Sequence, residues 1–122
     1  MDNDPIWTIE NLKRTCDESD TACEWSFIIN PNIEYQAPTP CKYTTESLDG
    51  MPASMAVQDG MDCGPYHVSS SWSGQFGPDH GFTTLAIVDG EYRLVAFPSY
   101  SDEELKDGKV VVPDQGFVPH EF

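Results

Sequence analysis

The 122-residue sequence predicts one all-β domain, a compact β-sandwich or barrel with one short helix and two disulfides. Three observations predict this fold. Short runs that alternate apolar and polar residues are separated by clusters of Gly, Pro, Asn and Asp, which is typical of strands and turns. Hydrophobic residues make up 39% of the chain, enough to fill a core. Four cysteines are available, and the length is that of one domain, which we assign to residues 1–122.

The cysteines are Cys16, Cys23, Cys41 and Cys63. Their number is even, and no pair has the spacing of a zinc ribbon or of a redox motif. Three pairings are possible, and we favour Cys16–Cys23 with Cys41–Cys63 because each closes a short loop across an expected turn. Such loops would contribute about 2.5 and about 3.4 kcal/mol. Disulfides indicate a secreted, extracellular protein, whereas four free thiols would indicate a cytosolic one.

The chain carries 21 acidic against 6 basic residues, a net charge of −15. This charge repels phosphate backbones and anionic lipid head groups, so neither nucleic acid nor a membrane surface is an expected partner. The apolar runs are far shorter than a membrane span, so membrane insertion is not expected. We expect a monomer rather than an oligomer. The polar start Met1–Asp4 contains no signal peptide, so we expect a signal to have been removed and Met1 to be an expression start. No N-glycosylation site occurs in the sequence.

The first half of the chain predicts three strands, at Pro5–Glu10, Cys23–Ile29 and Lys42–Thr45. In the second of these, alternate residues would share a buried face. They are Cys23, Trp25, Phe27 and Ile29. A fourth strand at Tyr66–Trp72 has the same alternation, with Tyr66, Val68, Ser70 and Trp72 on one face.

A hairpin is predicted around Asp89-Gly90, which separates two β-rich runs. Asp-Gly favours a two-residue type I′ turn, because both turn residues need a positive φ. This turn would place Val88 opposite Glu91, Ile87 opposite Tyr92 and Leu85 opposite Leu94. The expected core face is Leu85, Ile87, Tyr92 and Leu94, and the opposite face Val88, Glu91 and Arg93.

The one predicted helix runs from Ser101 to Gly108. Ser101 can cap its N-terminus, Glu104 completes a capping box and Gly108 can end it. The tail after Val112 contains two prolines and should be extended.

No residue is predicted to be catalytic, to bind a metal or to hold a cofactor. The histidines His67, His80 and His120 lack a zinc-binding spacing, and His67 is expected to be a surface or hydrogen-bonded residue. Ser71 and Ser73 lie outside any nucleophile elbow. A calcium site formed by loop carboxylates is an open alternative, although the acids lack the order of an EF-hand. These acids are Asp59, Asp62, Asp102, Glu103 and Glu104.

Two hydrolase classes are further alternatives. A glycosidase needs two carboxylates across a cleft, but among 21 acids some pair meets by chance. A guanyl-specific ribonuclease fits the size and charge, yet only Arg14 and Arg93 can contact phosphate and no local motif matches.

The glycine-rich loop from Trp72 to Phe82 carries three large aromatic rings. These rings either plug the open end of the fold or form a recognition loop, since rigid aromatic side chains on loops are efficient contact anchors. The candidate binding residues are Trp72, Gln75, Phe76, His80 and Phe82.

At this loop the sequence resembles a known group. The segment WSGQFGPDHGFTTLAIV (72–88), together with Pro98–Asp102, Gly108–Gln115 and the N-terminal Trp7–Cys16, is similar to small secreted fungal proteins. That group includes elicitors of the rice blast fungus that induce a hypersensitive response in plants. The resemblance implies a secreted β-sandwich or barrel with two disulfides and without known enzymatic activity. Only the four cysteines are carried over from it, as structural bridges.

The sequence thus favours a non-enzymatic secreted fungal effector or elicitor, with a possible role in virulence, that induces plant defence or cell death. It would do so by binding a host component, either a plant protein or a cell-surface component. The alternatives are a small secreted hydrolase and a carbohydrate- or ligand-binding module, which exposed tryptophans would favour.

Overall fold

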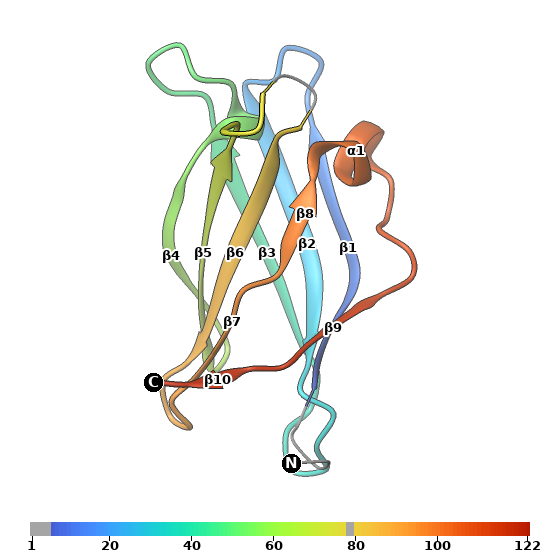
Figure 1. Cartoon of the computed structure of the whole chain (residues 1–122), viewed down its shortest axis with the longest axis vertical. Helices are drawn as coiled ribbons and strands as arrows, with labels where there is room; N and C mark the ends of the chain where they lie inside the picture. The colour runs from blue at the N-terminus through green and yellow to red at the C-terminus, as the bar shows by residue number, and fades with distance from the viewer. Residues whose placement is uncertain (1–5, 78–79) are drawn as a thin grey trace.

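The computed structural model describes residues 6–77 and 80–122, and it contains two antiparallel β-sheets (Figure 1). One sheet has the strand order β3-β2-β1-β9, and the other has the order β10-β7-β6-β5-β4, with β8 paired to β6. Pro5 of the first predicted strand and Pro78 and Asp79 of the predicted loop lie outside the described residues, as does the side chain of Asp59.

The strands are β1 (Trp7–Cys16), β2 (Ala22–Asn30), β3 (Thr39–Glu46), β4 (Gln58–Cys63), β5 (Tyr66–Ser73), β6 (Phe82–Asp89), β7 (Leu94–Ala96), β8 (Ser99–Ser101), β9 (Gln115–Phe117) and β10 (His120–Glu121). The helices are the 3-10 turns η1 (Ala53–Met55) and η2 (Lys106–Gly108) and the short α1 (Asp102–Leu105). The predicted all-β class with one short helix is therefore confirmed. Among the described helices, none has the length and apolar character needed to cross a bilayer.

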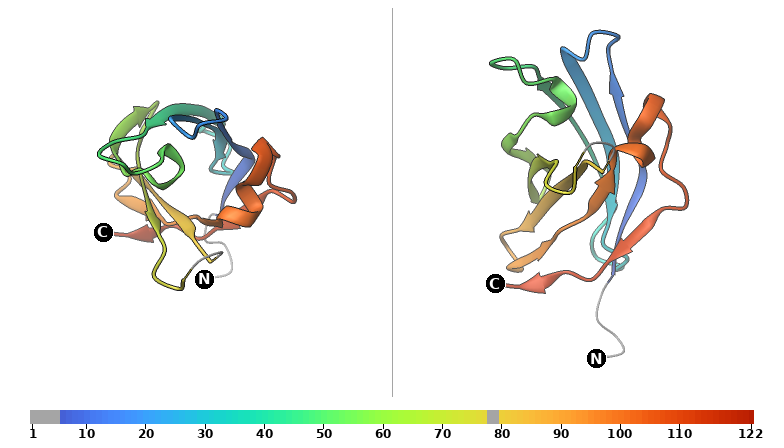
Figure 2. Two further views of the ribbon diagram at one scale, coloured as in Figure 1. Left: turned by 90° about the horizontal axis from the view of Figure 1, so that it is seen from above. Right: turned by 45° about the horizontal axis from the view of Figure 1, so that its top comes forward.

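The two sheets enclose one core, and seen from one end their strands form a ring around it (Figure 2). In β2 every second side chain points inward, which confirms the predicted buried face at Cys23, Trp25, Phe27 and Ile29. The ring of Trp25 stacks parallel to that of Tyr43 on β3, with centroids 5.9 Å apart. The other sheet contributes the buried side chains of Tyr66, Val68, Leu85, Ile87 and Ala96.

Strand β1 continues six residues beyond the predicted end at Glu10, because a bulge lets it change faces rather than stop. The pairing with β2 shifts between Glu10 and Lys13, and Asn11 adopts a positive φ of 53°. An extra residue in one strand reverses which side chains point inward. Consequently Leu12 and Arg14 are buried after the bulge, whereas Trp7 and Ile9 are buried before it.

The predicted disulfide pairing is confirmed. Cys16–Cys23 joins β1 to β2 at residues that are direct partners in the ladder, with Cα atoms 4.0 Å apart. Cys41–Cys63 joins β3 to β4 and therefore ties one sheet to the other. The first bridge reinforces pairing that hydrogen bonds already provide, whereas the second connects two layers that contact each other through side chains.

The predicted two-residue hairpin at Asp89-Gly90 is wrong. Asp89 is itself the last residue of β6 and pairs with Leu94, so the turn spans residues 90–93. The carboxylate of Asp89 accepts the backbone N–H groups of Glu91 at 3.0 Å and of Tyr92 at 3.2 Å, and it is Arg93 that takes the positive φ. An aspartate that binds the backbone two residues on stabilises this wider turn.

The register error moves each partner by four residues, so Ile87 lies opposite Ala96 rather than Tyr92. An even shift keeps the side chains on their faces, which is why Leu85 and Ile87 are buried and Leu94 is half-buried as expected. Tyr92, however, lies in the turn and is exposed rather than part of the core.

The capping box of the predicted helix is confirmed. The backbone N–H of Glu104 donates to Ser101 Oγ at 3.1 Å, and the N–H of Ser101 donates to Glu104 Oε1 at 2.9 Å. After one turn the chain leaves the α conformation, with positive φ at Asp107 and Gly108. The cap fixes the start of α1 and with it the position of Asp102.

Candidate functional site

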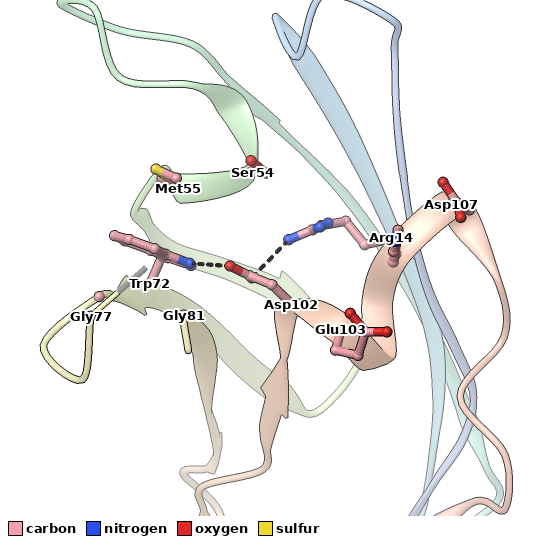
Figure 3. A pocket seen from close by; sticks show the side chains of 11 residues that line it. Arg14, Ser54, Met55, Trp72, Gly77, Gly81, Asp102, Glu103 and Asp107 are labelled. Atoms are coloured by element: carbon pink, nitrogen blue, oxygen red, sulfur yellow. Dashed lines mark hydrogen bonds and ion pairs between the residues drawn. The ribbon is translucent and has the colours of Figure 1, made fainter. Parts of the chain in front are cut away.

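One end of the molecule carries an open pocket of about 690 Å³. We call it the pocket end; it lies at the top of Figure 1, where the β1–β2, β3–β4 and β5–β6 loops meet α1. Figure 3 shows that Arg14 and Asp102 point into the pocket from one side and that Trp72 lies across from them. The turn η1 adds Ser54 and Met55 as a further wall.

Arg14 reaches the pocket from β1 because the bulge at Asn11 turns its side chain inward. Only 8% of the residue is exposed, an unusual state for an arginine. Its guanidinium carbon lies 5.9 Å from the ring centroid of Trp25, within reach of a cation–π interaction. Its Nη1 atom lies 3.5 Å from Oδ1 of Asp102, which neutralises the charge.

Asp102 joins two walls of the pocket. Its Oδ2 atom accepts a hydrogen bond of 2.9 Å from the indole Nε1–H of Trp72, while its Oδ1 atom faces Arg14. The backbone at Gly81 lies close to both side chains, since a Cβ atom at this position would collide with Asp102 and with Trp72. A Cβ atom at Gly74 would likewise collide with the Trp72 ring. The two glycines therefore let the backbone hold the indole in one orientation.

The structure divides the predicted recognition loop into two parts. Trp72 is half-buried and lines the pocket with Gly74, Gly77 and Gly81. Phe76 is 66% exposed and stacks on the half-buried Phe82, with ring centroids 5.8 Å apart. Gln75 and His80 are exposed and are not among the residues that line the pocket. A binding role for these five residues stays a prediction.

Sequence reasoning missed Arg14 and Asp102 as members of one site. The sequence places Arg14 beyond the end of the first predicted strand and offers it only as a phosphate contact of the ribonuclease alternative, while Asp102 is only a candidate calcium ligand and a helix acid. The available signal was Asn11, because asparagine tolerates a positive φ and can therefore sit in a bulge. After such a bulge, Leu12 and Arg14 would share one face of the strand.

Metal-binding side chains meet at one place in the described ranges, where Cys16, Asp20 and Cys23 lie together. The two sulfurs are joined in a disulfide, so neither is available as a thiolate ligand. The carboxylate of Asp20 instead accepts the backbone N–H of Ser54 at 2.8 Å and also the Ser54 hydroxyl, which ties the β1–β2 loop to η1. This corner is structural.

The three histidines lie on separate elements. His67 on β5 is exposed, and its Nδ1 atom is 2.9 Å from Oδ1 of Asp62, as expected for a hydrogen-bonded surface residue. His80 lies in the β5–β6 loop and His120 on β10.

The strongest pKa shifts belong to core tyrosines. Burial, and then the charge of Asp89, raises the pKa of Tyr66 to about 12. Burial also raises the pKa of Tyr43 and Tyr100. These phenols remain protonated at neutral pH and serve as packing groups.

The fold and the pocket define a disulfide-bridged β domain, and its open end combines an aromatic ring with an ion pair between the buried Arg14 and the half-buried Asp102. A family model described as Effector TSP1 matches residues 8–122 of this chain. The protein Effector TSP1 of Hypocrea virens (strain Gv29-8 / FGSC 10586) is 43% identical over 115 residues, which cover 94% of this chain and 76% of that relative. The chain therefore belongs to the Effector TSP1 family and is a fungal effector protein. Closer kinship with the rice blast elicitors stays a prediction.

Proposed function

We propose that this protein is secreted and acts outside the fungal cell, where it binds a host plant component without catalysing a reaction and thereby induces defence or cell-death responses. The observation that carries the proposal is the match to the Effector TSP1 family over residues 8–122. Secretion is supported by the disulfides, because both bridges require an oxidising compartment and together they use every cysteine of the chain.

Contact with the host component is assigned to the pocket end. Phe76 presents a large aromatic surface there, 66% exposed and braced by Phe82 behind it. A rigid, exposed aromatic ring beside a pocket is the kind of anchor that contributes most to protein recognition. The opposite end of the molecule, which we call the far end, is formed by the β2–β3 loop, the β6–β7 turn and the C-terminus (Figure 1). Its β2–β3 loop has an exposed aromatic ring of similar size, Tyr35, which supplies a matched control.

Infiltration of the purified, disulfide-intact protein into leaves tests this function. We expect a defence or cell-death response to the unmodified protein, a weaker response to Phe76→Ala and an unchanged response to Tyr35→Ala. Incubation with plant cell-wall polysaccharide and with RNA should release no product. Absence of any leaf response, combined with unchanged growth and virulence after deletion of the gene, would remove the effector proposal. Equal responses to both variants would remove the assignment to the pocket end.

A further inference from the structure

The connection between β3 and β4 contains a tight turn with two apolar side chains that the core does not use. Leu48 is 72% exposed and Met51 is 48% exposed, and neither belongs to the hydrophobic cluster between the sheets. The turn lies at the pocket end, in the green loop at the top of Figure 1. One exposed leucine would need no explanation, whereas two apolar side chains held together on one loop form a candidate contact surface.

The backbone of the turn holds these two side chains together. The N–H of Leu48 donates to the oxygen of Met51 at 3.1 Å, and the N–H of Met51 donates to the oxygen of Leu48 at 2.9 Å. Between them Asp49 and Gly50 have φ angles of 50° and 80°, and a type I′ turn requires positive φ at both positions. Residues paired in this way project their side chains on the same side of the hairpin. Leu48 and Met51 therefore form one surface, which we call the apolar tip.

The apolar tip is fastened to the neighbouring β1–β2 loop. The N–H of Ser47 donates to the oxygen of Thr21 at 2.9 Å, and the N–H of Ala53 donates to the oxygen of Asp20, also at 2.9 Å. An open groove of about 320 Å³ lies between the two loops and is lined by residues 19–21 and 47–52. Because the backbone of the tip is fixed in the free protein, contact with a partner costs less conformational entropy there than on a flexible loop.

The charge of the surrounding loops selects the partner. The sequence has no lysine or arginine from residue 43 to residue 92, a range that includes the β3–β4 and β5–β6 loops, and it has none in the β1–β2 loop. Acids do occur there, with Asp49 inside the turn and Asp17, Glu18 and Asp20 in the β1–β2 loop. These loops attract a basic surface and repel an acidic one. A partner of the apolar tip should therefore combine apolar side chains with positive charge.

We propose that the apolar tip is a docking site for an amphipathic, basic protein segment of the host component. Leu48 and Met51 pack against its apolar side chains, while the acids of the surrounding loops attract its lysines and arginines. The inference rests on the proposed function, because it names the chemistry of the host component and adds a second anchor to Phe76 at the pocket end. Its test uses purified protein and synthetic peptides, so failure of peptide binding and failure of the leaf response are separate results.

Fluorescence anisotropy with three labelled peptides of equal length tests the inference. One peptide has leucine and lysine at helical spacing, the second has glutamate in place of lysine, and the third has serine in place of leucine. We expect the leucine–lysine peptide to bind most tightly and the leucine–glutamate peptide most weakly. Higher salt should weaken the binding of the leucine–lysine peptide, because the attraction of exposed charges is screened.

The double variant Leu48→Ser with Met51→Ser removes the apolar tip. It should lower the association constant of the leucine–lysine peptide about tenfold, since two apolar side chains no longer lose their exposed surface on binding. Tyr35→Ser with Tyr92→Ser is the matched control, because these exposed rings lie 6.3 Å apart at the far end. This control should leave the association constant unchanged.

A single variant protects the test against loss of folding. Asp49→Asn removes one charge from the turn, and asparagine tolerates the positive φ of this position. It should weaken binding of the leucine–lysine peptide about threefold at low salt. The inference is overturned if this peptide does not bind at millimolar concentration, or if either of the other two peptides binds equally well. It is also overturned if the two double variants bind the peptide with equal affinity.

Discussion

The chain has two arginines, one at each end of the molecule, and the structure treats them in opposite ways. At the far end, formed by the β2–β3 loop, the β6–β7 turn and the C-terminus, Arg93 is exposed and donates from Nε to the backbone oxygen of Phe122 at 2.9 Å. Its guanidinium also lies 4.9 Å from the centre of the Phe122 ring. At the pocket end, Arg14 is buried and two of its nitrogen atoms lack a hydrogen-bond partner among the described residues.

This difference shows that the fold stabilises its two arginines in different ways. Arg93 binds the C-terminal Phe122 through its Nε–H group, and the rest of its guanidinium is exposed to solvent. Arg14 is held in place by Trp25 and Asp102, while its Nε and Nη1 atoms form no hydrogen bond with the described residues. The buried hydroxyl groups of Tyr43, Tyr66, Thr83 and Tyr100 also lack a partner among the described residues, so a missing hydrogen bond does not by itself identify a ligand site.

The two disulfides also lie at opposite ends of the molecule. Removing either of them should have the largest effect on the free energy of unfolding. Cys41→Ala with Cys63→Ala disconnects the two sheets at the far end and should lower the free energy of unfolding by about 3.4 kcal/mol. Cys16→Ala with Cys23→Ala affects one ladder at the pocket end and should cost about 2.5 kcal/mol. Thermal unfolding measures both. A larger loss from the second pair would contradict this ranking.

The ion pair at the pocket end should give the next largest effect. Asp102→Ala leaves the buried guanidinium of Arg14 without its counter-charge and removes the hydrogen bond to Trp72. We expect a loss of about 2 kcal/mol, below the range for a fully buried pair because the Asp102 side chain is 37% exposed. The neighbouring Glu103→Ala, on the exposed side of α1, should change stability by less than about 0.5 kcal/mol. Equal unfolding midpoints in urea for the two variants would refute a structural role of the pair.

Alkaline pH should weaken the molecule through its core tyrosines, including Tyr66 near the far end. In the unfolded chain the phenol loses its proton near its ordinary pKa of 10.0, whereas in the folded state Tyr66 keeps the proton up to about 12. This contribution to stability is therefore complete below pH 10 and is lost as the pH rises through 12.

Tyr66→Phe isolates this effect. The Tyr66 hydroxyl is buried without a partner among the described residues, so phenylalanine should be tolerated at neutral pH. The variant should lose less stability than the unmodified protein at high pH, by about 1–2 kcal/mol. Tyr43 and Tyr100 shift in the same direction, so part of the alkaline sensitivity should remain. Identical pH dependences, followed by thermal unfolding, would show that Tyr66 titrates normally.

The smallest effects on stability should come from the exposed aromatic rings at the two ends. Phe76→Ala and Tyr35→Ala each remove a side chain that is mostly in solvent, so each should cost less than about 1 kcal/mol. Comparable melting temperatures would confirm that any difference between them in leaves reflects recognition. A large loss for Phe76→Ala would instead identify its stacking on Phe82 as a structural contact.

Local patterns predicted most of the fold. Strand β2 was recognisable because its side chains alternate on a half-buried face, and α1 because Ser101 and Glu104 cap it through neighbours in sequence. The disulfide pairing followed from short loops across turns, and the structure has the same pairing. Each of these features depends on residues close together in the chain, which is the information that a sequence pattern contains.

The hairpin register and the pocket could not be found in the same way. The Asp-Gly signal failed because the Asp89 side chain binds the turn backbone and stabilises a wider loop. The pocket brings together Arg14, Trp72 and Asp102 from β1, β5 and α1, and a bulge decides that Arg14 points inward. Periodicity within one strand does not show which residues from other strands and helices will lie beside it in the folded protein.

Leaf infiltration of Phe76→Ala and Tyr35→Ala at equal concentration, beside the unmodified protein, tests most directly whether the pocket end contacts the host component. We expect a weaker defence or cell-death response to Phe76→Ala and a response to Tyr35→Ala equal to that of the unmodified protein. Equal responses to the two variants, or a weaker response to Tyr35→Ala alone, would contradict the assignment of recognition to the pocket end.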